Sequence, residues 1–88
     1  MPSEADVAQW MLDEVRRDEE LDQEYASYEI QSRFGDEFVY ENENSNLAIS
    51  KSVLDAFRRI SKKDVVWERG SRRWRLRDSD DGPGRQAD

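Results

Sequence analysis

Two segments near the end of the chain match each other across a short turn, and they constrain the fold more than any other feature of the sequence. The segments are VVWER (65–69) and RRWRL (72–76), with Gly70-Ser71 between them. Glycine at the first central position favours a two-residue type II′ turn, which sets Trp67 opposite Trp74. Side chains alternate along a strand, so one face of the hairpin then carries Val65, Trp67, Trp74 and Leu76, and the other carries Val66, Glu68, Arg73 and Arg75. We expect the apolar face to cover a core in preference to presenting both tryptophans to a ligand.

Three earlier stretches carry apolar residues at the spacing of one helix face. They predict helices at about 4–19, 23–34 and 51–61. Ser3, Asp22 and Ser50 are expected as the N-caps, because short oxygen-bearing side chains accept hydrogen bonds from the free N–H groups of a first helical turn. The apolar faces are Val7, Trp10, Met11 and Val15 in the first helix, Tyr25, Ala26, Ile30 and Phe34 in the second, and Val53, Leu54, Phe57 and Ile60 in the third.

The stretch between the second and third helices has a different character. Residues 38–40 and 47–49 favour extended structure, and they flank the polar, turn-like sequence ENENSN (41–46). The two extended segments could pair with each other, or one of them could pair with the C-terminal hairpin.

The predicted fold class is α+β, with three helices and a C-terminal β-hairpin in a single domain over residues 1–77. A chain of 88 residues has the length of one domain. Residues 78–88 contain glycine, proline and charge but no large apolar side chain, so we expect them to form a disordered acidic tail.

Composition argues against several classes of function. The chain has no histidine and no cysteine, so it lacks the commonest transition-metal ligands and the commonest general base. No pair of carboxylates is set apart by an apolar pocket that would raise a pKa. We therefore expect a protein that is not an enzyme and that has no catalytic residue, cofactor or metal. No apolar run reaches the roughly 20 residues of a membrane span, and the acidic N-terminus is unlike a secretory signal, so we expect a cytoplasmic protein with no membrane partner.

Charge is divided along the sequence. Residues 1–50 contain fourteen Asp and Glu against three Arg, whereas residues 51–77 contain ten Lys and Arg against three acids. Such a division gives the molecule a directed surface potential. The best candidates for a binding surface are eight basic residues: Lys51, Arg58, Arg59, Lys62, Arg69, Arg72, Arg73 and Arg75. The alternative is an ordinary solvated surface on which these side chains pair with nearby carboxylates such as Glu68.

The order of the predicted elements resembles that of winged-helix domains, in which three helices are closed by a C-terminal hairpin. This resemblance implies that the 51–61 helix enters the major groove and that the hairpin touches the DNA backbone or minor groove. Two features depart from the pattern. The connection between the second and third helices is about fifteen residues long, where a standard helix-turn-helix has a turn of about 3–4. The net charge is −7, whereas nucleic-acid-binding domains are usually basic.

Four segments also resemble those of a family of short, uncharacterised bacterial proteins. They are FGDEFVY (34–40), NLAISKSVLDAF (46–57), VVWERGSRRWRLR (65–77) and GPGRQ (82–86). The resemblance covers most of the chain and implies a bacterial origin, but it implies no function.

Two functions of different class remain open. The first is a small module for protein–protein interaction through complementary acidic and basic surfaces, with weak self-association as one form of it. The second is a nucleic-acid-binding regulator that uses the 51–61 helix and the basic hairpin. The partner is therefore a protein or a nucleic acid.

Overall fold

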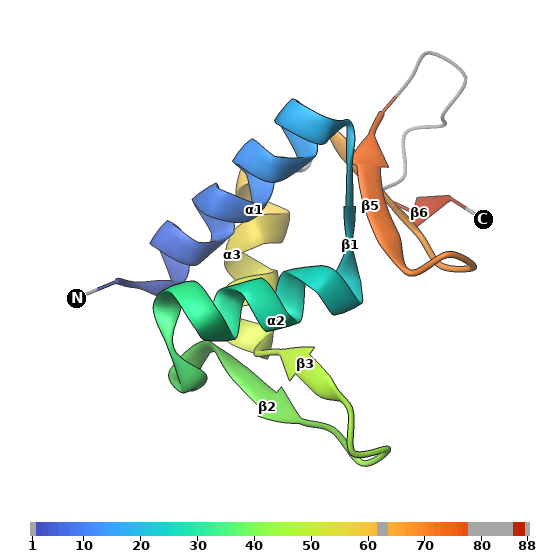
Figure 1. Ribbon diagram of the computed structural model, residues 1–88. Helices are drawn as coiled ribbons and strands as arrows, with labels where there is room; N and C mark the ends of the chain where they lie inside the picture. The colour runs from blue at the N-terminus through green and yellow to red at the C-terminus, as the bar shows by residue number, and fades with distance from the viewer. Residues whose placement is uncertain (1, 62–63, 78–85, 88) are drawn as a thin grey trace.

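The computed structural model describes residues 2–61, 64–77 and 86–87. Its elements follow in the order α1 (Glu4–Asp18), β1 (Glu20–Asp22), α2 (Gln23–Phe34), the 3-10 helix η1 (Asp36–Phe38), β2 (Val39–Glu41), β3 (Leu47–Ile49), α3 (Lys51–Ser61), β4 (Val65–Glu68), β5 (Arg73–Leu76) and β6 (Gln86–Ala87). The three helices lie at the centre, the sheet that contains the β4–β5 hairpin lies at one end, and the β2–β3 pair lies below α2 (Figure 1). The protein is therefore α+β, with three helices and a C-terminal hairpin, as the sequence predicts.

Helices α1 and α2 begin at the predicted residues because their predicted caps form, whereas the Ser50 hydroxyl contacts the Ser52 hydroxyl at 3.3 Å in place of a backbone N–H of α3. Ser3 and Asp6 make a capping box, in which each backbone N–H donates to the side chain of the other residue, at 2.9 and 3.3 Å. The Asp22 carboxylate accepts a hydrogen bond from the backbone N–H of Tyr25 at 3.0 Å and so caps α2. These local contacts explain why the helix bounds follow from the sequence.

Strand β1, between α1 and α2, is an element that the sequence pattern does not reveal. Glu19 has a left-handed φ of 69°, which ends α1 and turns the chain into the strand. Leu21 pairs with Trp74 and is buried, whereas its neighbours Glu20 and Asp22 are exposed. Because β1 pairs antiparallel with β5, it extends the hairpin to a sheet with the order β1-β5-β4-β6.

The register of the hairpin is the predicted one. Val65 pairs with Leu76 and Trp67 pairs with Trp74. The two indole rings lie on the same face with centroids 4.8 Å apart; Trp74 is buried and Trp67 is half-buried against the core. The tryptophan face of the hairpin therefore packs on the helices.

The opposite face of the hairpin differs in one respect from its expected polar character. Val66 is buried there, with 1% of its surface exposed. It pairs with Arg75, whose side chain is only 24% exposed. Burial of Val66 is understandable because long charged side chains lay their aliphatic stems over apolar neighbours.

The turn of the hairpin is not the expected type II′ turn. Four residues, 69–72, separate β4 from β5. A type II′ turn needs a positive φ at Gly70, but the residue of this turn with a positive φ is Arg72, at 54°. The carbonyl of Arg72 accepts a hydrogen bond from the N–H of Gln23 at 3.0 Å. This bond continues the β1–β5 ladder and ties the turn to the start of α2, a tertiary contact that the local sequence does not contain.

The other edge of β4 carries β6, which runs parallel to it. Trp67 pairs with Gln86 and Glu68 pairs with Ala87. These two strand residues fall within the tail 78–88 that was expected to be disordered, and the rest of that tail lies outside the described residues.

The extended segments on either side of ENENSN pair with each other. β2 and β3 are antiparallel, with Tyr40 opposite Ala48. Phe38, expected at the start of the first segment, instead belongs to η1 and is buried in the core. The connection between α2 and α3 is thus a small hairpin of its own.

One core joins the helices and the sheet. Its fully buried side chains include Val7, Met11, Ile30, Val53 and Phe57. Two residues that helical spacing places on core faces are exposed instead: Tyr25 at 47% and Ile60 at 42%. Tyr25 lies in the first turn of α2 and Ile60 in the last turn of α3, where less of the helix is covered by neighbouring elements. Trp10 is half-buried and packs edge-to-face on Phe34, with centroids 6.1 Å apart.

None of the helices in the described ranges is both long enough and apolar enough to cross a bilayer.

Candidate functional site

Three of the eight candidate basic residues lie on the outer side of α3. Lys51, Arg58 and Arg59 are all exposed. Lys51 and Arg58 are two helical turns apart and share a face, with Asp55 between them. None of the three cations makes an ion pair within residues 2–61, 64–77 and 86–87. Lys62, the next candidate along the sequence, lies outside the described residues.

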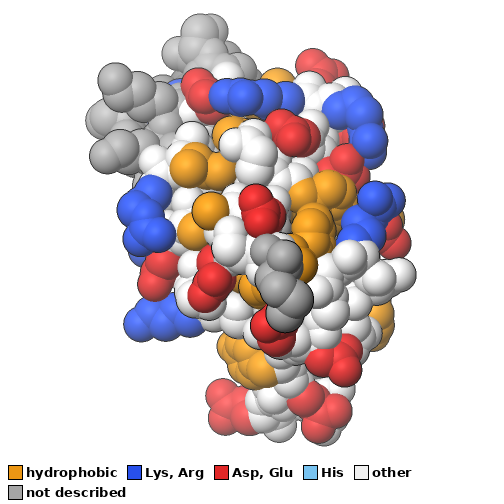
Figure 2. Space-filling view, turned by 90° about the vertical axis from the view of Figure 1, so that its left-hand side faces the viewer, with side chains coloured by type: hydrophobic (Ala, Val, Ile, Leu, Met, Phe, Trp, Pro, Cys, Tyr) orange, Lys and Arg blue, Asp and Glu red, His pale blue; other side chains and the backbone are white. Residues whose placement is uncertain are grey.

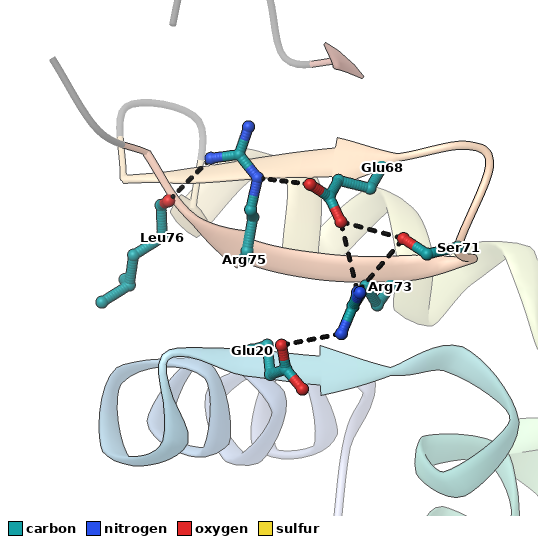
Figure 3. A network of polar contacts seen from close by, with 6 residues as sticks. All are labelled: Glu20, Glu68, Ser71, Arg73, Arg75 and Leu76. Atoms are coloured by element: carbon teal, nitrogen blue, oxygen red, sulfur yellow. Dashed lines mark hydrogen bonds and ion pairs between the residues drawn. The ribbon is translucent and has the colours of Figure 1, made fainter. Parts of the chain in front are cut away.

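Two arginines of the hairpin share one carboxylate, as Figure 3 shows. The Nε atom of Arg75 donates to Oε2 of Glu68 at 2.8 Å, and the Nε atom of Arg73 donates to Oε1 at 3.2 Å. The Ser71 hydroxyl also donates to Oε1, at 2.8 Å. The Nη1 atom of Arg73 donates in turn to Oε2 of Glu20 at 2.9 Å. The hydrogen bond from Arg75, followed by that from Ser71, holds the pKa of Glu68 below its usual range.

This network, the Glu68 network, joins side chains of β1, β4 and β5 on the outer face of the sheet (Figure 3). The side chains of Arg73 and Arg75 are 39% and 24% exposed. A phosphate that approached them would compete with Glu20 and Glu68 for the same N–H groups. Arg73 and Arg75 are therefore less available to a ligand than their sequence positions suggest.

The remaining two candidates, Arg69 and Arg72, lie in the exposed turn between β4 and β5. The eight basic residues thus divide into three on α3, two in the turn, two in the Glu68 network and one outside the described residues. On the face that Figure 2 shows, Lys and Arg side chains are interspersed with Asp and Glu and do not form one continuous basic field. These residues are close together in the sequence, but the fold separates them.

A polar groove of about 470 Å³ lies where three segments of the chain meet. Its walls come from the start of α2, from the β2–β3 hairpin and from the β4–β5 turn. In Figure 1 the start of α2 and the two turns point to the same side of the molecule. The residues that line the groove include Gln23, Tyr28, Asn44, Asn46, Leu47 and Arg72.

The β2–β3 turn leaves hydrogen-bonding groups open in this groove. The side-chain oxygen of Asn42 accepts from the backbone N–H groups of Asn44 and Asn46, at 2.9 and 3.1 Å. The side-chain amides of Asn44 and Asn46 and the hydroxyl of Tyr28, a residue that is 55% exposed, have no hydrogen-bond partner in the described part of the chain. The sequence marks ENENSN as a turn but gives no sign of the groove, because its walls come from three separate segments.

The sequence profile of a family of unknown function matches residues 3–76. The chain belongs to that family, DUF6953. The match includes all three helices, the groove and the Glu68 network, and it ends before the segment 78–88. Membership of DUF6953 agrees with the resemblance to an uncharacterised family that the sequence segments indicate. No curated protein and no solved structure matches the chain.

Proposed function

We propose that this DUF6953 protein is a non-catalytic module that binds another protein through complementary charged and polar surfaces. The division of the basic residues carries this proposal. Carboxylates pair with Arg73 and Arg75 in the sheet. Lys51, Arg58 and Arg59 on α3 are exposed and make no ion pair in the described part of the chain, so they form a small basic face that a partner can reach. A protein partner can match basic and acidic surfaces at once, since charge complementarity steers association and fixes its orientation.

Exposed carboxylates on other parts of the surface favour a protein over a nucleic acid. Asp22, which caps α2, and Glu24 in its first turn are both exposed. Glu41 and Glu43 of the β2–β3 hairpin are exposed as well. These carboxylates repel phosphates. Binding to nucleic acid gains affinity with each phosphate that is neutralised. In the described part of the chain four exposed cations make no ion pair, namely Lys51, Arg58, Arg59 and Arg72, and they supply few such contacts.

Exposed tyrosines support the same conclusion. Tyr25, Tyr28 and Tyr40 are 47%, 55% and 52% exposed, on α2 and β2. Tyrosine is enriched at protein interfaces because its ring provides apolar contact area while its hydroxyl forms hydrogen bonds. In a chain in which 40% of residues are charged, these side chains are the main exposed aromatic surface.

The second candidate function is nucleic-acid binding in the manner of a winged-helix domain. The element order, three helices followed by a hairpin, supports it. In that case α3 would present Lys51, Arg58 and Arg59 to the major groove, and the turn would present Arg69 and Arg72 to the backbone.

Photo-crosslinking in cells distinguishes the two functions. A photoreactive amino acid replaces Arg58 on the outer side of α3, and in a matched variant it replaces Gln31, an exposed residue of α2. We expect a discrete adduct at position 58 that a protease destroys and a nuclease does not, with no such adduct at position 31. An adduct that nuclease removes would establish the second function, and equal labelling at both positions would contradict a specific surface on α3.

A further inference from the structure

Strand β3 has one edge free of any strand. Within the described residues, β2 is its only strand neighbour. Two hydrogen bonds identify the residues of β3 that face β2: the N–H of Asn42 donates to the carbonyl of Asn46, and the N–H of Ser50 donates to the carbonyl of Phe38, both at 2.9 Å. In an antiparallel pair, hydrogen-bonded residue pairs alternate with non-bonded pairs.

The alternation determines which backbone groups of β3 point outward. With Asn46 and Ser50 bonded to the partner strand, Ala48 is bonded as well, and Leu47 and Ile49 turn their N–H and C=O groups away from β2. Neither Leu47 nor Ile49 makes a backbone hydrogen bond to another element in the part of the chain that the structure describes. Ile49 is buried and Leu47 is half-buried, so the accessible end of this edge is at Leu47.

The polar groove runs along this edge. Side chains of successive strand residues leave on opposite faces, yet Leu47 and Ala48 both line the groove. A groove that touches both faces of a strand passes along its edge. Tyr28 of α2 lies on the same groove, and Asn46 and Arg72 line it from the two turns.

We propose that this groove binds an extended segment of a partner protein, which adds as a strand to the free edge of β3 at Leu47. Unpaired strand edges accept extended peptides through main-chain hydrogen bonds, with specificity provided by pockets for alternate side chains. The free amides of Asn44 and Asn46 suit the same partner, because an amide can donate to and accept from a peptide group. The inference rests on the proposed function and adds a second surface, apart from the basic face of α3, together with the form of the segment that binds there.

Charge indicates the side chains that the partner segment carries. Asp22 and Glu24 line the groove, and Glu41 pairs directly across from Leu47 on β2. Against these carboxylates, the cation among the described residues that line the groove is Arg72. An extended segment with basic side chains therefore fits, and one with acidic side chains is repelled.

Selection of a random twelve-residue peptide library displayed on phage, with the full chain as the target, tests the proposal. We expect enriched peptides that carry Lys or Arg and residues that favour extended structure. Their affinity should fall at least tenfold when each basic residue of the peptide is replaced by Glu. On binding, amide exchange at Leu47 should slow, since its outward N–H gains an acceptor.

Two changes test the backbone contact separately. Leu47→Pro removes a backbone N–H group that forms no hydrogen bond with β2, and proline is tolerated at such positions of edge strands. Because the partner segment would lose this donor, binding should weaken at least tenfold. N-methylation of the peptide residue opposite Leu47 should have a similar effect without any change in the protein. The matched control, Gln31→Ala at an exposed position of α2 outside the groove, should leave peptide affinity within about twofold. A separate variant, Arg58→Glu with Arg59→Glu, reports whether the peptide binds α3 instead.

Three results would overturn the inference: no enriched peptide, enriched peptides that are acidic, or affinity that neither Leu47→Pro nor N-methylation alters. Peptides that lose affinity through Arg58→Glu with Arg59→Glu, but not through Leu47→Pro, would place the binding surface on α3. That outcome would refute the β3 edge as the site and leave the proposed protein-binding function intact.

Discussion

Leu21→Ala tests the strand that the sequence pattern does not reveal. Leu21 is the buried centre of β1, with 3% of its surface exposed, and it pairs with Trp74. The substitution removes three carbon atoms, which at about 0.8 kcal/mol per buried CH₂ gives about 2.4 kcal/mol. The cavity left behind adds to this, because Leu→Ala changes in cores cost about 2–5 kcal/mol in total. We therefore expect a loss of about 3 kcal/mol in the free energy of unfolding, or roughly 12–24 °C in Tm for a domain of this size.

Urea denaturation followed by far-UV circular dichroism measures this loss. Tryptophan fluorescence is less suitable as the probe because Trp74 pairs with the substituted residue. Ile60→Ala is the matched control: it also truncates an aliphatic side chain, but Ile60 is 42% exposed, so the loss should stay below about 1 kcal/mol. Equal, small losses in the two variants would refute the burial of Leu21 between the helices and β5.

Three further outcomes follow from other parts of the fold. Glu68→Gln should destabilise the protein at pH 7. The lowered pKa of Glu68 means that its contribution to stability is fully present above the usual carboxyl pKa of about 4.3. The difference from wild type, measured by thermal unfolding across pH, should therefore shrink as pH falls below about 4.3 and disappear once pH is below the lowered pKa of Glu68. Single and double Trp→Leu changes at Trp67 and Trp74 should give a coupling energy of about 0.5–1.5 kcal/mol in a double-mutant cycle, and additivity would contradict the ring contact. Ser3→Ala should cost about 1 kcal/mol in urea denaturation through loss of the capping box, and an unchanged stability would show that the cap does not contribute.

The elements that the sequence predicts well are those fixed by local signals. The capping box at Ser3 and the cap at Asp22 set the starts of α1 and α2, and alternating side chains set the register of β4 with β5. These contacts involve residues close in the chain. Local sequence patterns are therefore sufficient to predict these contacts.

The features that the sequence does not predict depend on contacts between distant segments. The sequence ELD around Leu21 has one apolar residue between two acids, a pattern that indicates a break between helices. It becomes a strand because it pairs with β5, which is more than fifty residues away in the chain. The turn at residues 69–72 is shaped by a bond from Gln23, and Ile60 is exposed because of its place at the end of α3.

The same distinction between local contacts and contacts of distant segments applies to the candidate site. The eight basic candidates lie in one charged stretch of the sequence, but their pairing depends on where the fold places carboxylates. Glu68 is near the arginines in sequence, and Glu20 is brought to Arg73 by the β1–β5 pairing. The groove at β3 is assembled from three segments, so no pattern within any one of them indicates it.

We propose that the basic stretch does not bind nucleic acid, because carboxylates within the sheet pair with Arg73 and Arg75. Fluorescence anisotropy with a labelled random DNA duplex, titrated at several salt concentrations, tests this most directly. Lys51, Arg58, Arg59 and Arg72 are the cations that make no ion pair in the described part of the chain, so the slope of log affinity against log salt should be no steeper than about −4. Arg73→Ala with Arg75→Ala should leave that slope unchanged. A slope of about −5 or steeper that those two substitutions reduce would contradict the claim.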